Sequence, residues 1–304
     1  MIGAEQGSSR TVDEATGPAA PPMPGAMLGH SVLAQRSSGV IRLAMRRRDG
    51  ATVLERLHQS GPLRLRIVRP EPGRWATAIL LNTGGGIAGG DDHQLDIAAQ
   101  SGTALTLSTQ GAERVYRQGD GDAPARIAMR IAIADAAFVE YLPQETILFD
   151  RSALERRLRV DLTGSAGYLG VESLIFGRGA MGEVVRLLTL SDGIALYRDG
   201  TLLFRDVFRP PHSFATSRRR AMLGDAGAMA TILFVAPGAA ARLDAVRSML
   251  DGAALDGAAA AVSAWNGLLL VRILAQTGAM MRMIVLLVLE MLRGGRAMPR
   301  VWGC

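Results

Sequence analysis

The strongest constraint on the fold is the stretch of residues 76–117, in which a glycine-rich loop joins segments with the pattern of β-strands. Residues 78–81 form a short apolar run, typical of a buried strand. Five glycines fall within residues 84–90, and glycine tolerates the positive φ angles and close backbone approach of tight loops. After the loop, apolar side chains recur at every second position in residues 95–99 and again in 105–109. This period of two predicts a β-hairpin or meander.

The glycine loop also has a nucleotide-binding interpretation. Gly84, Gly86 and Gly89 match the G-x-G-x-x-G spacing of dinucleotide-binding loops. That fingerprint requires a helix directly after the glycines, because the helix N-terminus binds the pyrophosphate. The alternation that follows favours a turn between strands, and the chain has no lysine for a Walker-type phosphate loop. A dinucleotide-dependent enzyme using residues 84–90 is therefore the alternative hypothesis, and it predicts a helix after Gly90.

Composition narrows the class of protein. The chain has 304 residues, of which 48% are hydrophobic and 20% charged, so it can bury a sizeable core. Every basic residue except the histidines is arginine, the net charge is +6, and only 5% of residues are aromatic. A basic chain with few stacking side chains favours an anionic protein partner over a single-stranded nucleic acid. The lone cysteine, Cys304, excludes an internal disulfide and a zinc site of several thiolates, and it suits the cytoplasm.

The composition of the chain changes along its length. Residues 1–28 are rich in Gly, Ala, Pro and Ser and lack the pattern of a signal peptide, which predicts a disordered leader. We expect residues 29–304 to form a single domain. Its β-rich body spans about 29–236, where alternating segments follow one another at short spacing. Within the body, Asp199-Gly200 is a two-residue hairpin signal. A smaller α+β part spans about 237–304, with helical spacing in residues 242–250 and 277–292 and two short strands expected around Asn266-Gly267. Its apolar helix core is too short to cross a membrane.

Groups that carry chemistry are scattered. The four histidines show no H-E-x-x-H pairing, and no G-x-S-x-G nucleophile elbow occurs. Glu140, Glu145 and Glu172 lie within or beside apolar segments, and Asp91 closes the glycine loop. One interpretation pairs each of these acids with an arginine, since buried carboxylates are rarely unpaired. The other interpretation places them along a polar internal passage, where divalent ions such as Ni²⁺ bind carboxylates loosely and move on.

Several motifs, in order from about residue 40 to the C-terminus, resemble one family. They are residues 60–64, 82–91, 108–117, 141–149, 177–183 and 299–302. Together they make the chain similar to the UreD (also called UreH) urease accessory proteins. Two positions depart from the family pattern: Gly84 stands where Ser, Thr or Pro is commoner, and Gly111 replaces a usual Ala. The leader has no counterpart in the family.

This resemblance implies a fold and a function. The fold would be mainly β, with a β-helical two-layer body of mostly antiparallel and mixed strands and a small α+β C-terminal part. The protein would be a cytoplasmic nickel-insertion chaperone scaffold and not an enzyme. It would bind apo-urease and UreF, and through UreF the GTPase UreG, without contacting nucleic acid or membrane.

Nickel would be in transit through an internal channel, with no tightly bound cofactor. Combined with the acids in apolar segments, this makes Asp91, Glu140, Glu145 and Glu172 candidates for the channel lining, with Thr109 and Gln110 as polar neighbours. A third hypothesis, a β-scaffold that binds some other protein, stays open at this point.

Overall fold

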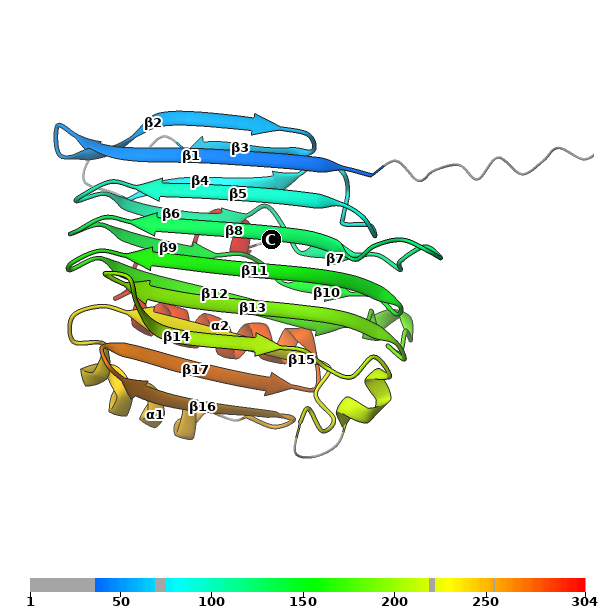
Figure 1. Ribbon diagram of the computed structural model, residues 1–304. Helices are drawn as coiled ribbons and strands as arrows, with labels where there is room; N and C mark the ends of the chain where they lie inside the picture. The colour runs from blue at the N-terminus through cyan, green and yellow to red at the C-terminus, as the bar shows by residue number, and fades with distance from the viewer. Residues whose placement is uncertain (1–35, 69–74, 219–221, 254, 304) are drawn as a thin grey trace, which may run out of the picture. The chain divides into compact units, whose positions relative to one another are not determined.

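The computed structural model describes residues 36–68, 75–218, 222–253 and 255–303. The leader predicted for residues 1–28 lies outside these described residues. The chain from Arg36 onward forms one compact unit built of two sheets, with a few helices near the C-terminus (Figure 1). The prediction of a mainly β fold with a small α+β C-terminal part is confirmed.

The two sheets are here called sheet A and sheet B. Sheet A has the strand order β14 (Thr201–Phe208), β13 (Leu188–Arg198), β11 (Ser152–Leu162), β8 (Ala125–Ile133), β5 (Asp92–Ala99), β1 (Ser38–Arg48) and β2 (Ala51–Ser60). Sheet B has the order β16 (Ala258–Trp265), β17 (Leu268–Ala275), β15 (Ala228–Val235), β12 (Gly167–Phe176), β9 (Phe138–Leu142), β6 (Ala104–Thr109), β4 (Ala76–Asn82) and β3 (Leu63–Val68). Two short strands, β10 (Thr146–Leu148) and β7 (Glu113–Val115), extend sheet B beside β12.

In the middle of the chain, successive long strands lie alternately in sheet A and sheet B. From β4 onward the long strands alternate, with β4, β6, β9 and β12 in sheet B and β5, β8, β11 and β13 in sheet A. Within each sheet these successive strands pair in parallel. Antiparallel pairs occur at the margins, where β2, β3, β14 and the last strands of sheet B join. This winding is the β-helical two-layer body that the family resemblance implies.

The hairpin predicted for residues 95–99 and 105–109 is wrong. The first segment belongs to β5 in sheet A and the second to β6 in sheet B, so the two strands do not pair with each other. The turn at Ser101 and Gly102 carries the chain from one sheet to the other. A period of two identifies a half-buried strand, but it does not say which neighbour that strand pairs with.

The same period places side chains on the two faces of each sheet. In β5, His93, Leu95 and Ile97 are buried, whereas Gln94 and Asp96 are exposed. Inward-facing apolar side chains from both sheets form the main core of the body. Any polar group at an inward position therefore enters an apolar layer and needs a partner there.

The C-terminal part covers the outer face of sheet B. Helices α1 (Leu243–Gly252) and α2 (Gly278–Leu292) pack on β15, β16 and β17 and close a second core. Both match the helical spacing in the sequence, and Thr277 caps α2 by accepting a 3.2 Å hydrogen bond from the Met280 N–H. The turns at Asp199–Gly200 and Asn266–Gly267 close hairpins, as predicted. No helix in the described residues is long and apolar enough to span a membrane.

The glycine loop leads into a strand. Residue Gly90 is followed by β5, so the helix that a dinucleotide site needs is missing and the alternative hypothesis is wrong. The glycines instead allow a close packing contact. A Cβ on Gly86 would lie 2.3 Å from the Tyr116 ring, whose hydroxyl donates a 2.7 Å hydrogen bond to the Gly85 carbonyl.

Candidate functional site

A polar cavity of about 460 Å³ lies between the two sheets. Its walls include the inward faces of β5, β8 and β11 from sheet A and of β9 and β12 from sheet B. Apolar side chains make up much of the lining, but polar side chains interrupt it. They are Asn82, His93, Thr109, Gln110, Glu113, Arg114, Tyr141, Gln144, Thr146, Arg156, Arg157 and Glu172.

Glu172 on β12 forms part of a buried charge cluster in this cavity. Its carboxylate lies 2.8 Å from Arg156 Nη2, and the same guanidinium donates two hydrogen bonds, of 2.7 and 2.8 Å, to Asp192. Arg156 Nη1 donates a third, of 3.0 Å, to the Thr146 hydroxyl. The Glu172 Oε2 lies off the N–H directions, so no described residue satisfies it with a hydrogen bond. The Arg156 guanidinium therefore forms ion pairs with two carboxylates, those of Glu172 and Asp192.

Burial raises the pKa of Glu172 to about 7. The charge of Arg156 opposes this shift, whereas the neighbouring Asp192 adds to it. Arg156 itself stays charged, because its two carboxylate neighbours raise its pKa against the cost of burial. Glu172 is therefore a carboxyl group that exchanges its proton near neutral pH.

His93 on β5 enters the cavity from sheet A. The side chain is 2% exposed, and its Nε2 lies 3.3 Å from the Ser37 hydroxyl. Burial lowers the pKa of His93, although Asp91 and Asp92 pull it upward. The imidazole is therefore neutral at pH 7, the form in which histidine binds a metal ion.

Glu113 on β7 borders the cavity from the end of sheet B. Burial raises its pKa, and hydrogen bonds from the Asn82 amide at 3.2 Å and the Arg114 N–H at 3.3 Å oppose that rise. Asp91 raises the pKa of Glu113 further by charge repulsion. The carboxylate is held in place by Asn82, whose amide also donates to the Gly86 carbonyl in the glycine loop.

Asp91, the first of the four predicted acids, braces the glycine loop. Its Oδ1 accepts a 2.7 Å hydrogen bond from the Ser37 N–H, and its Oδ2 accepts one of 2.9 Å from the Ala88 N–H. The side chain is 5% exposed. Its two oxygens thus join the loop to the start of β1.

Glu140 on β9 points away from the cavity, toward the helical layer. The side chain is fully buried and accepts two 3.0 Å hydrogen bonds from Arg293, one of 2.5 Å from Arg296 and one of 2.7 Å from the Thr106 hydroxyl. Arg293 is itself only 4% exposed. Glu140 is thus paired with arginines, as the first interpretation of the sequence predicts. These contacts join sheet B to the end of α2 and are here called a clamp.

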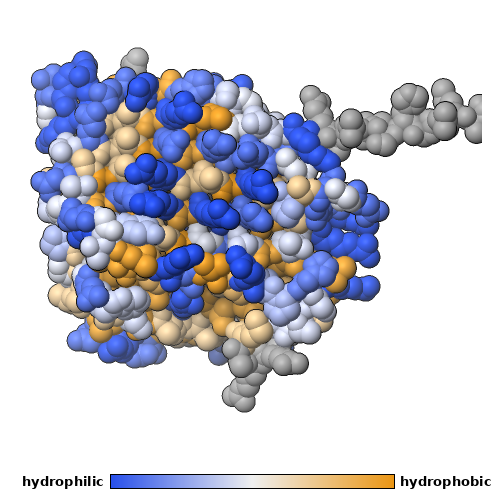
Figure 2. Space-filling view, in the orientation of Figure 1, coloured by the Kyte–Doolittle hydropathy of each residue, from blue (hydrophilic) through white to orange (hydrophobic). Residues whose placement is uncertain are grey.

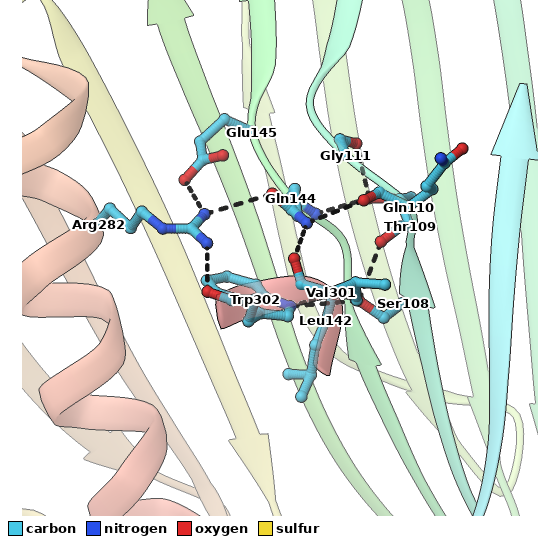
Figure 3. A network of polar contacts seen from close by, with 10 residues as sticks. All are labelled: Ser108, Thr109, Gln110, Gly111, Leu142, Gln144, Glu145, Arg282, Val301 and Trp302. Carbon is cyan, nitrogen blue, oxygen red and sulfur yellow. Dashed lines mark hydrogen bonds and ion pairs between the residues drawn. The ribbon is translucent and has the colours of Figure 1, made fainter. Parts of the chain in front are cut away.

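Glu145 takes part in a second clamp, which fastens the C-terminal segment (Figure 3). The Arg282 guanidinium, on α2, donates a 2.9 Å hydrogen bond to Glu145 and one of 2.7 Å to the Trp302 carbonyl. The indole N–H of Trp302 in turn donates to Ser108 and to the Leu142 carbonyl, at 3.2 and 3.1 Å. Half-buried Arg282 and buried Glu145 thus hold the turn at Arg300–Gly303 on sheet B.

Thr109 and Gln110 connect this clamp to the cavity. Both border the cavity, as Gln144 does. Thr109 accepts a 2.8 Å hydrogen bond from the Gln144 N–H, and the Gln144 amide donates to the carbonyls of Gln110 and Val301, at 3.3 and 2.5 Å (Figure 3). Gln144 therefore touches both the cavity wall and the C-terminal segment.

Of the four predicted acids, the structure places Glu172 in the cavity and the other three on protein donors outside its lining. Sequence reasoning did not select His93 and Glu113, which the fold brings to the same cavity. A signal for His93 was present, because it alternates in register with Leu95 and Ile97 and so had to face inward. Within the described residues, no group of three His, Cys, Asp or Glu side chains is arranged to hold a metal ion.

Comparison with known proteins shows the family of this chain. A family model described as "UreD urease accessory protein" matches residues 37–303. The chain is 42% identical over 273 residues to "Urease accessory protein UreD 2" of Methylorubrum populi, with 88% of this chain and 91% of that protein covered. It is 39% identical over 269 residues to "Urease accessory protein UreD" of Rhizobium leguminosarum bv. trifolii, with 88% and 96% covered. The chain belongs to the UreD family.

We expect Glu140→Ala to destabilise the fold by about 3–5 kcal/mol, because it leaves the buried Arg293 unpaired. Urea denaturation followed by circular dichroism measures this loss. The matched control is Glu155→Ala, which removes a half-exposed carboxylate 3.8 Å from Arg126 and should cost under about 1 kcal/mol. Equal losses in the two variants contradict the clamp.

Glu172 should make stability fall as pH rises. Its folded pKa of about 7 exceeds the ordinary 4.5, so between these values the folded state keeps a proton that the unfolded state has lost. The corresponding stability is present below pH 4.5 and is lost as pH rises through about 7. Glu172→Gln should flatten the dependence of unfolding free energy on pH by about 3 kcal/mol over this window. An unchanged slope in this variant, matching that of Glu155→Gln, argues against a raised Glu172 pKa.

Proposed function

We propose that this chain is a non-enzymatic accessory protein for the maturation of urease, acting in the cytoplasm. Its relatives carry the name urease accessory protein, and it shares about 40% of its residues with them over almost their full length. In this proposal Ni²⁺ is cargo. The chain binds apo-urease and UreF, and UreF brings the GTPase UreG.

The observation that supports a nickel route is the polar cavity between the sheets. It combines the neutral imidazole of His93 with the carboxyl groups of Glu113 and Glu172, and nitrogen and oxygen donors of this kind suit Ni²⁺. The donors lie apart on different strands. An ion held by one or two ligands at a time is bound weakly enough to move on, which is what delivery requires.

Nickel binding in the cavity also depends on the loss of a proton. A carboxyl group must lose its proton to bind a metal ion, and Glu172 does so near pH 7. Arg156 beside it adds a fixed positive charge, which opposes a second cation at the same place. Both effects should shorten the time that a Ni²⁺ ion stays bound in the cavity. A nickel-lining role of Asp91, Glu140 and Glu145 stays a prediction. The carboxylates of these three residues already accept hydrogen bonds from protein groups, and binding a nickel ion would have to compete with those bonds.

Obstruction of the cavity tests the proposal without removing any ligand. Gly111 borders the cavity, is exposed, and has no atom within 4 Å of where a Cβ would stand. Gly111→Trp therefore places an indole at the rim with little strain. We expect it to lower the nickel content of urease, matured in a reconstituted mixture with UreF, UreG, GTP and Ni²⁺, to about a tenth.

The matched control is Gly252→Trp, at the end of α1, where a Cβ also meets no atom within 4 Å. Co-purification of each variant with UreF and apo-urease shows whether the complex still assembles. Assembled complexes with normal nickel content in Gly111→Trp contradict the route. Failure of the unsubstituted chain to bind apo-urease contradicts the proposed function as a whole.

A further inference from the structure

The outer face of sheet A carries a hollow of about 650 Å³ that the proposed nickel route does not use. It crosses β5, β8, β11, β13 and β14 on the side of the sheet opposite the cavity. Strand β11 shows this division, because Arg156 faces inward to Asp192 whereas Arg157 and Arg159 are exposed. In Figure 2 hydrophilic residues gather over the middle of this face, among apolar neighbours.

The hollow exists because small side chains lie beside large ones in register. Arg157 pairs with Gly193 and Arg159 with Ala195 across β11 and β13. A Cβ on Gly193 would meet no atom closer than 3.7 Å, so the floor is open. Five arginines, from β8, β11, β14 and the residue after β14, stand around this floor. They are Arg130, Arg157, Arg159, Arg205 and Arg209, and together with the floor they are called the arginine groove.

The arginine groove keeps an excess of positive charge. Asp161 accepts hydrogen bonds from both Arg130 and Arg159, and so partly neutralises two of the five guanidiniums. Among the described residues, Arg157 and Arg205 have no carboxylate within ion-pair distance. Asp96 and Asp206 also border the hollow, and Asp206 pairs with Arg272 at 2.7 Å, so arginines still outnumber the acids there. An excess of one sign of charge in a hollow concentrates the field and attracts the opposite charge.

We propose that the arginine groove docks an acidic segment of a partner protein. A guanidinium presents two N–H donors that match a carboxylate, and the small floor leaves room for a peptide backbone between the arginines. Nucleic acid fits less well, because binding of single strands relies on aromatic side chains that stack bases. Among the described residues that border the groove, Tyr197 is the one aromatic residue, and the Arg159 guanidinium covers its ring at 4.3 Å. The exposed groove side chains lie on the face of sheet A opposite the nickel route, and Arg157 borders both the groove and the cavity.

The test measures binding of a fluorescein-labelled oligoglutamate peptide to the full chain by fluorescence anisotropy at low salt. An oligoglutamine peptide of the same length and a single-stranded DNA oligonucleotide serve as comparison probes. The groove variant is Arg157→Gln with Arg205→Gln, two exposed side chains outside any ion pair of the described residues. The control variant is Arg48→Gln with Arg247→Gln, which removes the same charge at exposed positions away from the groove.

We expect oligoglutamate to bind the unsubstituted chain and oligoglutamine not to bind. The groove variant should weaken oligoglutamate binding by about tenfold and the control variant by less than about twofold, because two direct ion pairs are lost only in the first. Equal weakening in both variants, or no binding of oligoglutamate, overturns the proposal. Tighter binding of DNA that depends on the same two arginines also overturns it, in favour of a nucleic-acid surface.

Discussion

The alternation of successive strands between two sheets is the constraint on which the rest of the structure depends. It gives every strand of the body one face toward the opposing sheet and one face away from it. A polar residue at an inward position therefore meets the opposite sheet, where Glu172 of β12 finds Arg156 of β11. A polar residue at an outward position of sheet A meets solvent, where Arg157 stands beside Gly193. The cavity therefore lies on the inward face of sheet A and the arginine groove on its outward face.

Much of this fold follows from the sequence, and its limits have physical reasons. The period of two located strands, and the Asp199–Gly200 and Asn266–Gly267 turns located hairpins, because both signals are local. Pairing between strands is not local, so residues 95–99 and 105–109 gave a wrong hairpin prediction. The two-layer β-helical arrangement came from the family resemblance and not from periodicity.

For the candidate site too, local sequence patterns predicted which acids are buried, but they did not predict the distant residues that contact them. An acid in an apolar segment was correctly recognised as buried at Glu140, Glu145 and Glu172. Which arginine would neutralise each acid depended on contacts across more than a hundred residues for Glu140 and Glu145, whose partners follow or belong to α2. Those two acids hold the C-terminal layer on sheet B. Glu172, with the least complete set of partners, is the one that faces open space.

We propose that Ni²⁺ enters the cavity between the sheets and binds there at scattered donors. The most direct measurement is a nickel anomalous difference map from a crystal of this chain soaked in Ni²⁺. We expect partly occupied peaks inside the cavity, beside His93, Glu113 or Glu172. Peaks confined to the outer surface, with none in the cavity, would contradict it.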